Sequence, residues 1–125
     1  MKIKTAELEG IALDWLVWCC AGGAVAYPAL QGAKFVRAWR GNSAKYVHPS
    51  TEWDQGGPMI DRFGISVQKF DGSGPPERMW NAYMHEPPLR GEDEIVGPTP
   101  LVAVCRCYVA DMLGHEVEVP EDILS

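Results

Sequence analysis

Basic residues are scarce in this sequence. It carries 11 Lys and Arg against 17 Asp and Glu, which gives a net charge of −6. Binding to duplex nucleic acid requires clustered basic side chains that displace counterions, so we expect no nucleic-acid partner. Anionic membrane surfaces are disfavoured for the same reason. An acidic protein can still occupy a basic groove on another protein, and that alternative stays open.

The sequence also lacks a long hydrophobic run. The stretch Ile11–Ala29 is largely apolar, but Asp14 interrupts it and Gly22-Gly23 breaks it well short of the roughly 18 residues of a membrane-spanning helix. No basic segment with a small-residue cleavage site precedes it, so we expect no signal peptide. The sequence therefore predicts a cytosolic protein.

Neither cysteine pair has the C-x2-C spacing of structural zinc sites. Cys19 and Cys20 are adjacent, and Cys105 and Cys107 are two residues apart within a predicted helix. In a reducing cytosol these thiols are interpreted as small buried hydrophobic groups. The nucleophile-elbow pattern G-x-S-x-G is absent as well. We therefore assign no catalytic residue, no metal ligand and no cofactor.

The length of 125 residues is typical of one domain, and we treat residues 1–125 as a single unit. The N-terminal segment predicts a helix that Thr5 caps and Gly22-Gly23 ends. Its apolar stripe consists of Leu8, Ile11, Trp15, Leu16 and Cys19, and Trp18 widens it.

The C-terminal third predicts a second helix, Leu101–Leu113. Thr99 is its expected N-cap, Pro100 fits its first position and Gly114 suits its C-terminal end. His115–Val119 alternates as an extended tail. Between the helices, apolar and polar residues alternate as in short strands at Lys34–Trp39, Lys45–Val47, Met59–Phe63, Ile65–Phe70 and Arg78–Met84. Ala24–Gln31 and Glu86–Val96 are predicted loops. The fold class is therefore α+β, a small antiparallel sheet packed by an N-terminal and a C-terminal helix.

The most informative segment is Tyr46–Asp61, which contains His48-Pro-Ser-Thr-Glu-Trp-Asp-Gln-Gly-Gly-Pro58. It combines an imidazole, hydroxyls, carboxylates, an amide and an indole between two stiffening prolines. One reading is a binding loop, in which the glycine amides approach a ligand closely. The other is a capped turn, in which Ser50 or Thr51 caps a short helix, Trp53 fills the core and the glycines end the helix. His48, Ser50 and Asp54 are close in sequence, but neighbours along the chain seldom have the geometry of a catalytic triad.

Five tryptophans are more than a chain of this length needs for its core, so some are expected at a ligand pocket or an interface. Arg106 lies in the otherwise apolar C-terminal helix. Its side chain either reaches the surface, pairs with a buried acid, or presents a cation to a ligand. The ligand-binding candidates are His48, Ser50, Thr51, Trp53, Gln55, Gly56, Gly57, Arg62 and Arg106.

Three segments of the chain resemble the NinX-like family of bacteriophage and prophage proteins. They are the His48–Ile60 segment, Gly97-Pro-Thr-Pro-Leu with Arg106-Cys-Tyr-Val-Ala, and the opening Met-Lys-Ile-Lys-Thr-Ala-Glu-Leu-Glu-Gly-Ile-Ala-Leu-Asp-Trp. The resemblance implies a small accessory protein in the cytoplasm of a bacterial host. It carries over no catalytic residue, since the family resembles a group without an assigned activity.

Two functions are favoured by these features, and a metal-free hydrolase is a third alternative. The first is a non-enzymatic protein that binds or sequesters a small polar, nucleotide-derived ligand at the His48–Pro58 loop, and so modifies host physiology or counters a host defence. Trp53 would stack on the ligand, and Arg62 or Arg106 would meet its anionic group. The second is an interaction module that inhibits a host protein. Homo-oligomerisation is compatible with all three.

Overall fold

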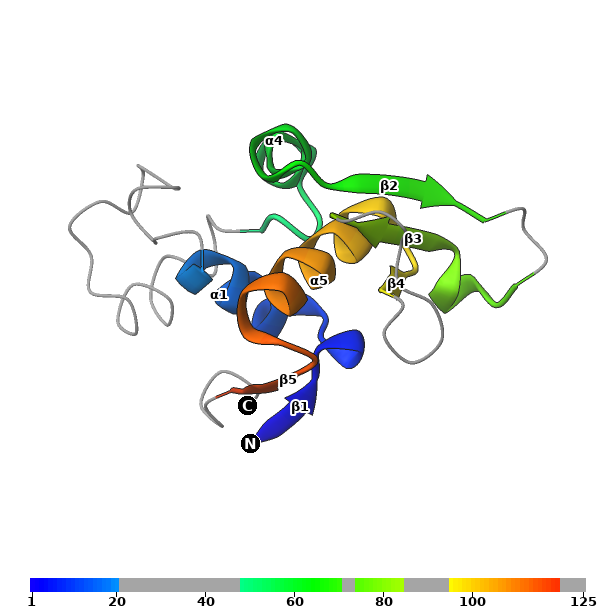
Figure 1. Ribbon diagram of the computed structural model, residues 1–125. Coiled ribbons are helices and arrows are strands. Elements are labelled where there is room, and N and C mark those ends of the chain that lie inside the picture. The colour runs from blue at the N-terminus through cyan, green and yellow to red at the C-terminus, as the bar shows by residue number, and fades with distance from the viewer. Residues whose placement is uncertain (21–47, 71–73, 85–94, 120–125) are drawn as a thin grey trace.

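A computed structural model describes residues 1–20, 48–70, 74–84 and 95–119 (Figure 1). Three α-helices, two 3₁₀ turns and five short strands lie within these ranges. In chain order they are β1 (Lys2–Lys4), η1 (Thr5–Glu7), α1 (Gly10–Cys20), α4 (Trp53–Phe63), β2 (Ser66–Lys69), η5 (Pro76–Arg78), β3 (Trp80–Tyr83), β4 (Val96–Gly97), α5 (Pro100–Leu113) and β5 (Glu116–Glu118).

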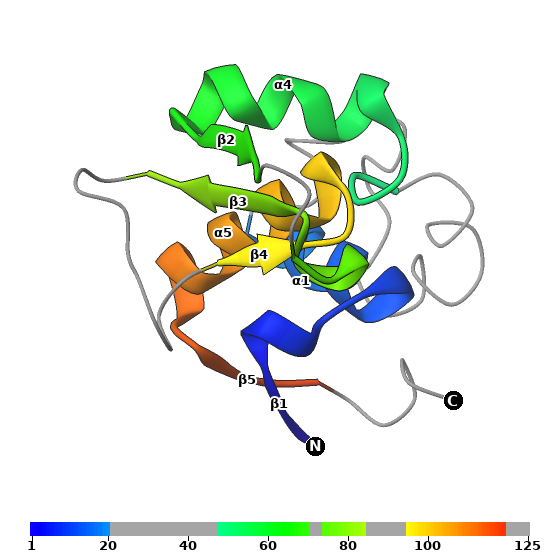
Figure 2. The same ribbon diagram turned by 90° about the vertical axis from the view of Figure 1, so that its right-hand side faces the viewer.

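Helix α5 is the centre of the described structure. Its start and end are as predicted: the Thr99 Oγ1 accepts a hydrogen bond from the Val102 N–H at 3.2 Å, Pro100 is its first residue, and Gly114 follows it with φ of +94°. Nine consecutive residues, Leu101–Val109, are buried. A surface helix would bury one face only, so α5 is a core helix that the other elements enclose (Figures 1 and 2).

Two antiparallel sheets lie on different sides of α5. The order of the larger sheet is β2-β3-β4, in which Ser66 pairs with Tyr83 and Trp80 pairs with Gly97. The smaller sheet joins the two ends of the described chain, β1 to β5. In Figure 2, α4 lies above the larger sheet and the β1–β5 pair lies below α5. The predicted α+β class, with strands packed by an N-terminal and a C-terminal helix, is confirmed, with the strands divided between two sheets.

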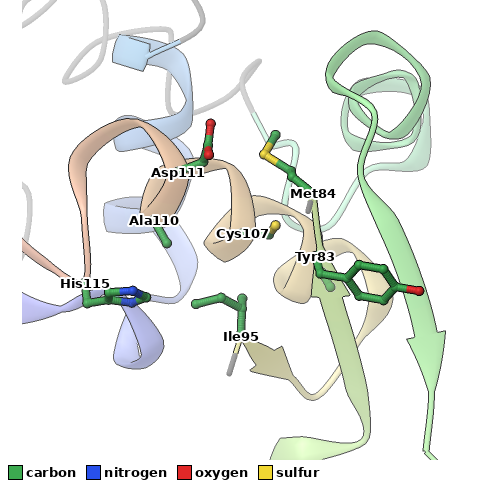
Figure 3. Close-up of a pocket in the computed structure, with 8 residues that line it drawn as sticks. Tyr83, Met84, Ile95, Cys107, Ala110, Asp111 and His115 are labelled. Atoms are coloured by element: carbon green, nitrogen blue, oxygen red, sulfur yellow. The ribbon is translucent and has the colours of Figure 1, made fainter. Parts of the chain in front are cut away.

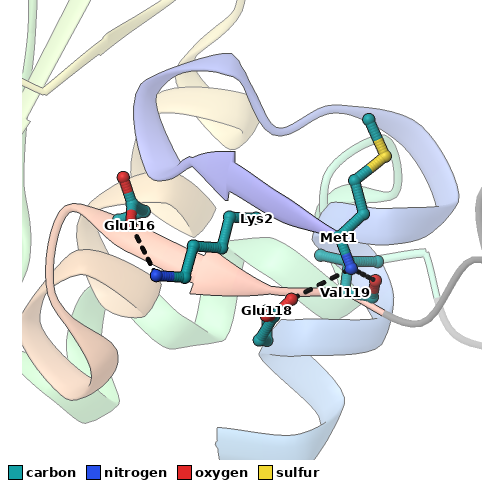
Figure 4. Close-up of polar contacts among 5 residues, drawn as sticks. All are labelled: Met1, Lys2, Glu116, Glu118 and Val119. Atoms are coloured by element: carbon teal, nitrogen blue, oxygen red, sulfur yellow. Dashed lines mark hydrogen bonds and ion pairs between the residues drawn. The ribbon is translucent and has the colours of Figure 1, made fainter.

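The N-terminal helix begins later than predicted, at Gly10, because the residues after strand β1 form the 3₁₀ turn η1 (Thr5–Glu7). Lys2 lies opposite Glu118, and the Met1 amino group contacts the Val119 carbonyl at 3.0 Å and the Glu118 carboxylate at 2.9 Å (Figure 4). Thr5 does not cap α1. It is buried, and its hydroxyl donates to the Gly114 carbonyl at 2.7 Å, at the end of α5. The tail predicted at His115–Val119 is confirmed as the partner strand β5.

Helix α1 is buried around most of its circumference, so the predicted single stripe describes it only in part. Every residue from Ala12 to Trp18 is buried, whereas two members of the predicted stripe, Ile11 and Cys19, are exposed. Helix α1 packs against α5, and Asp14 also bonds to residue Ser50. A helix covered from two directions does not show a single apolar face.

The predicted loop up to Asp61 and the predicted strand Met59–Phe63 are both wrong, because Trp53–Phe63 forms helix α4. Buried Gly56 and Met59, and half-buried Ile60 and Phe63, follow the i, i+3, i+4, i+7 spacing of a helix face. Pro58 lies inside the helix, where it removes one backbone hydrogen bond, and the preceding glycine lacks the Cβ that would otherwise crowd the proline ring. The glycine pair therefore does not end the helix. Gly64 ends it, with φ of +67° and its N–H bonded to the Ile60 carbonyl.

The remaining strand predictions have mixed outcomes. Ile65–Phe70 and Arg78–Met84 are confirmed by β2 and β3, while Val96, predicted as loop, belongs to β4. Other predictions lie outside the described residues: the helix end at Gly22-Gly23, Ala24–Gln31, Lys34–Trp39, Lys45–Val47 and most of Glu86–Val96.

Arg106 joins elements on two sides of α5. Its side chain is only 7% exposed, so the expectation that it reaches the surface is wrong. Its Nε donates to the Leu8 carbonyl at 2.7 Å, and its Nη1 donates to the Val96 carbonyl at 2.9 Å. The Val96 carbonyl is turned toward α5 because the neighbouring residue, Ile95, accepts the ladder hydrogen bond from β3. The guanidinium thus holds the start of α1 and strand β4 against the central helix.

Substituting Arg106→Met tests this role, because methionine keeps the aliphatic volume and removes both donors. The Leu8 and Val96 carbonyls would be left buried without the guanidinium, so we expect a loss of about 3 kcal/mol in the free energy of unfolding. Urea unfolding followed by Trp fluorescence measures this loss. The control Arg62→Met, on the exposed side of α4, should change stability by less than about 0.5 kcal/mol. Equal stability of the Arg106→Met variant and the wild type would contradict the assignment.

Candidate functional site

The segment that begins at His48 closes on itself through backbone and amide hydrogen bonds. The His48 carbonyl accepts from the N–H groups of Thr51 and Glu52 at 3.1 and 2.8 Å. The His48 N–H donates to the Gln55 Oε1 at 2.6 Å. The Gln55 amide oxygen is therefore engaged in holding the turn that leads into α4.

A buried carboxylate on α1 fastens this segment to the core. Asp14 is 3% exposed, and its Oδ1 accepts the Ser50 N–H at 2.9 Å. Its Oδ2 lies 3.8 Å from the His48 Nδ1. Burial raises the pKa of Asp14, and the neighbouring Ser50 and His48 oppose that increase. Asp14 is thus the anchor of the segment, a role that the sequence analysis did not assign to it.

Serine, histidine and aspartate meet here, but their arrangement is not that of a nucleophilic triad. The Ser50 hydroxyl lies beside Asp14, yet it makes no hydrogen bond of good geometry with any described residue. Ser50 is 2% exposed, so a substrate cannot reach it. The acid is Asp14 rather than the exposed Asp54 considered from the sequence. We call the contact of Asp14 with Ser50 and His48 the Asp14 clasp, and interpret it as structural.

The two glycines of the motif have different surroundings. A Cβ on Gly56 would lie 2.1 Å from the Pro49 carbonyl oxygen and 2.8 Å from the Leu101 Cδ2. A Cβ on Gly57 would lie 3.4 Å from the Trp53 Cε3, which is an ordinary contact. Gly56 is therefore required by the close packing of α4 on residues 49 and 101, and Gly57 is not.

The other candidate residues do not converge on one point. Trp53 is 57% exposed, which contradicts the reading that it fills the core. Arg62 is exposed and lies over the Phe63 ring at 5.5 Å. Trp53 and Arg62 are nine residues apart on α4 and so face directions roughly 180° apart. Thr51 is exposed beside the turn, while Arg106 is buried and bonded to Leu8 and Val96.

A cavity of about 210 Å³ lies elsewhere, at the C-terminal end of α5 (Figure 3). It is lined by Ala82, Tyr83, Met84, Ile95, Cys107, Ala110, Asp111 and His115. In Figure 3 the side chains of Met84, Ile95 and His115 point into it, whereas the Tyr83 ring points away. The sequence reasoning missed this cavity. Its one local signal is the i, i+3, i+4 spacing of Cys107, Ala110 and Asp111 on one face of α5.

The thiols of α5 are unsuited to nucleophilic chemistry. Burial, together with the nearby Asp111, raises the pKa of Cys107 to about 12. Burial also raises the pKa of Cys105. Cys107 is therefore protonated at neutral pH and acts as an apolar wall of the cavity, while Cys19 on α1 is exposed rather than buried as expected.

Within the described ranges, no three His, Cys, Asp or Glu side chains are grouped so that they could hold a metal ion. None of the helices in those ranges is both long and apolar enough to cross a bilayer.

Comparison with known proteins identifies the family. The chain matches the family described as Bacteriophage P22, NinX over residues 4–112. The protein belongs to this phage family. The match includes the Asp14 clasp, all of α4 and most of α5, and it confirms the resemblance seen in the sequence. No curated protein matches the chain. Membership of the NinX family thus provides a phage setting and leaves the activity to be inferred from the structure.

The glycine pair of this NinX-family chain provides a matched test of packing. Gly56→Ala should destabilise the fold by about 1–3 kcal/mol, because the added methyl group overlaps the Pro49 carbonyl. Gly57→Ala should change stability by less than about 1 kcal/mol, because alanine favours a helix and meets Trp53 only at ordinary contact distance, while its Cβ crowds the ring of Pro58, the next residue. Thermal and urea unfolding of both variants measure the difference. Equal effects of the two substitutions would contradict the packing described.

The Asp14 clasp should make stability depend on pH. Burial raises the folded-state pKa of Asp14 above the ordinary value of 3.8, so the folded chain binds more protons than the unfolded chain between these two pKa values. The contribution of Asp14 is therefore fully present below pH 3.8 and declines as the pH rises through the folded pKa. Asp14→Asn keeps an acceptor for Ser50 but cannot ionise. Urea unfolding of both proteins at several pH values from acidic to neutral should show the wild type losing stability relative to the variant as pH rises. Parallel curves of stability against pH for the wild type and Asp14→Asn would contradict this pH dependence.

Proposed function

We propose that this NinX-family protein acts without catalysis, as an interaction module that contacts a host protein through the first turns of α4. The observation that supports this is the 57% exposure of Trp53. Exposing an indole to water forgoes the free energy of burying a large apolar ring. Tryptophan is also among the residues that most often dominate the binding energy of protein interfaces.

The surroundings of Trp53 suggest the chemistry of the partner. Glu52 and Asp54 flank it in sequence, and Asp61 lies roughly 80° around the helix from it. All three acids are exposed. We call Glu52, Trp53, Asp54 and Asp61 the Trp53 face. A complementary surface would be basic and would offer an apolar recess for the indole.

Binding of a small polar, nucleotide-derived ligand at the His48–Pro58 loop has less geometric support. Ser50 is buried, the Gln55 amide oxygen is engaged by His48, and Gly56 is packed against Pro49. Of the ligand-binding candidates in this loop, Thr51 and Trp53 are the most exposed. The interaction module is therefore the better supported function, with the cytoplasm of the infected bacterium as its proposed location.

The test is capture of a host protein by purified wild-type protein and by Trp53→Ala. If Trp53 is the anchor of the interface, its loss should weaken the affinity for the captured protein by at least about 30-fold, as expected for a hot-spot residue. The stability of the variant should change by less than about 0.5 kcal/mol, because the side chain is exposed. Capture followed by titration of the identified partner measures both affinities.

The matched control is Met112→Ala, which removes another exposed apolar side chain, 51% exposed and located on α5. It should leave capture unchanged. Asp54→Asn with Asp61→Asn should reduce the affinity at low salt and flatten its salt dependence, because charge attraction is screened by ions. Capture that is the same with and without Trp53 would overturn the proposal.

A further inference from the structure

We propose that the cavity at the end of α5 binds a small, flat aromatic molecule of about the size of indole, either neutral or carrying an amine. This site is independent of the Trp53 face, since its walls come from β3, Ile95 and the last turns of α5. The proposal rests on the size of the cavity, on the chemistry of its walls and on the charges at its edge.

The volume is suited to one aromatic molecule. An apolar cavity of roughly 150 Å³ in another protein holds a benzene ring. The volume here is about 210 Å³, which leaves room for a second fused ring. Larger cofactors, such as dinucleotides, need sites several times this size. Ala82 and Ala110 contribute to this room because their side chains are methyl groups.

The walls are suited to an aromatic face. Two sulfur atoms line the cavity, the Met84 thioether and the Cys107 thiol. Sulfur contacts with aromatic rings are favourable and tolerate several geometries. Burial raises the pKa of Cys107 to about 12, so it presents a neutral thiol rather than a charged thiolate. Ile95 completes the apolar wall, and its carbonyl is held by the Ala82 N–H at 3.0 Å and the Asn81 amide at 3.3 Å. This wall is therefore well fixed.

Two titratable side chains select among aromatic molecules. Figure 3 shows the His115 ring directed toward the cavity, where it can exchange a hydrogen bond with a ring N–H or hydroxyl group. Asp111 contributes a carboxylate to the lining. An aromatic carboxylate would bring a second negative charge close to Asp111, so anionic ligands are disfavoured.

Indole is the probe for the test, titrated into the full-length protein and followed by NMR of methyl and amide groups. We expect saturable shifts at the methyl groups of Met84, Ile95 and Ala110, with a Kd of about 1 mM or tighter. Indole-3-acetate should bind at least about fivefold more weakly than indole, because its carboxylate faces Asp111. Absence of saturable shifts, or shifts that map away from these methyl groups, would overturn the proposal without the need for any variant.

Ala110→Leu adds three carbon atoms to the wall and should weaken indole binding at least tenfold. Ala110 is half-buried on a helix, so we expect the variant to fold, which far-UV circular dichroism can check. Met112→Leu, two residues along on the exposed side of α5, is the matched control and should bind as the wild type does. Equal binding by the Ala110→Leu variant would overturn the proposal.

A second copy of the chain could instead insert its own Trp53. Light scattering of the wild type, Trp53→Ala and Ala110→Leu distinguishes this occupant. If the protein self-associates, both substitutions abolish the association and indole does no more than compete with it, then the cavity holds the partner's Trp53 and the small-molecule proposal is overturned. Indole binding to a monomer would support the small-molecule proposal. Neither result depends on capture of a host protein through the Trp53 face.

Discussion

The contacts of the Arg106 guanidinium are the constraint on which the rest of the structure depends. A cation buried in the protein interior is costly, and burial accordingly lowers the pKa of Arg106, an effect that the nearby Glu9 opposes. Two backbone carbonyls compensate, one from Leu8 just before α1 and one from Val96 in β4. Because each carbonyl must reach the same planar group, the start of α1 and the edge strand β4 are fixed relative to α5. Fixing α1 places Asp14 where it can anchor Ser50, and fixing β4 places Ile95 at the wall of the cavity.

Burial of α5 along nine consecutive residues also limits where binding can occur. A helix enclosed on all sides offers no surface until its end, and the end is where the cavity opens, around Ala110 and Asp111. Among the described residues, a second accessible feature is α4, which packs on α5 through Gly56 against Leu101 and the Phe63 ring stacked on Tyr108, and leaves Trp53 in solvent. The Asp14 clasp is a separate polar contact, in which the buried Asp14 carboxylate accepts the Ser50 N–H. Such contacts fix one arrangement of the chain rather than supply free groups to a ligand.

Local signals in the sequence were sufficient to predict α5 and the α+β class, but they were not sufficient to predict the candidate site. The signals at the two ends of α5 come from Thr99, Pro100 and Gly114. They act on the helix itself, so they can be recognised without knowing what the helix packs against. Helix α4 was missed because Gly-Gly-Pro is a strong turn signal, although the spacing of Gly56, Met59, Ile60 and Phe63 is helical. Packing on α5 outweighs the weak helix propensity of this stretch. The role of Arg106 could not be predicted, because its partner Leu8 is 98 residues away, and Asp14 contacts Ser50 across 36 residues. Contacts of this range depend on the assembled fold.

The surplus of tryptophan that the sequence displayed has a more specific meaning in the structure. Trp15 and Trp18 are buried in the core, and Trp80 is half-buried with the Lys69 ammonium 5.9 Å from its ring. These three rings are accounted for by packing. Trp53 differs, since its ring lies along α4 above Gly57 and remains more than half exposed. The residues of this segment therefore fall into two groups. The turn and the first turn of α4 direct Ser50, Gln55 and Gly56 toward the core. The same turns direct Thr51, Trp53 and Asp54 toward solvent. The inward residues already stabilise the fold. A binding role at this segment therefore falls to the outward residues, and Trp53 has the largest apolar surface among them.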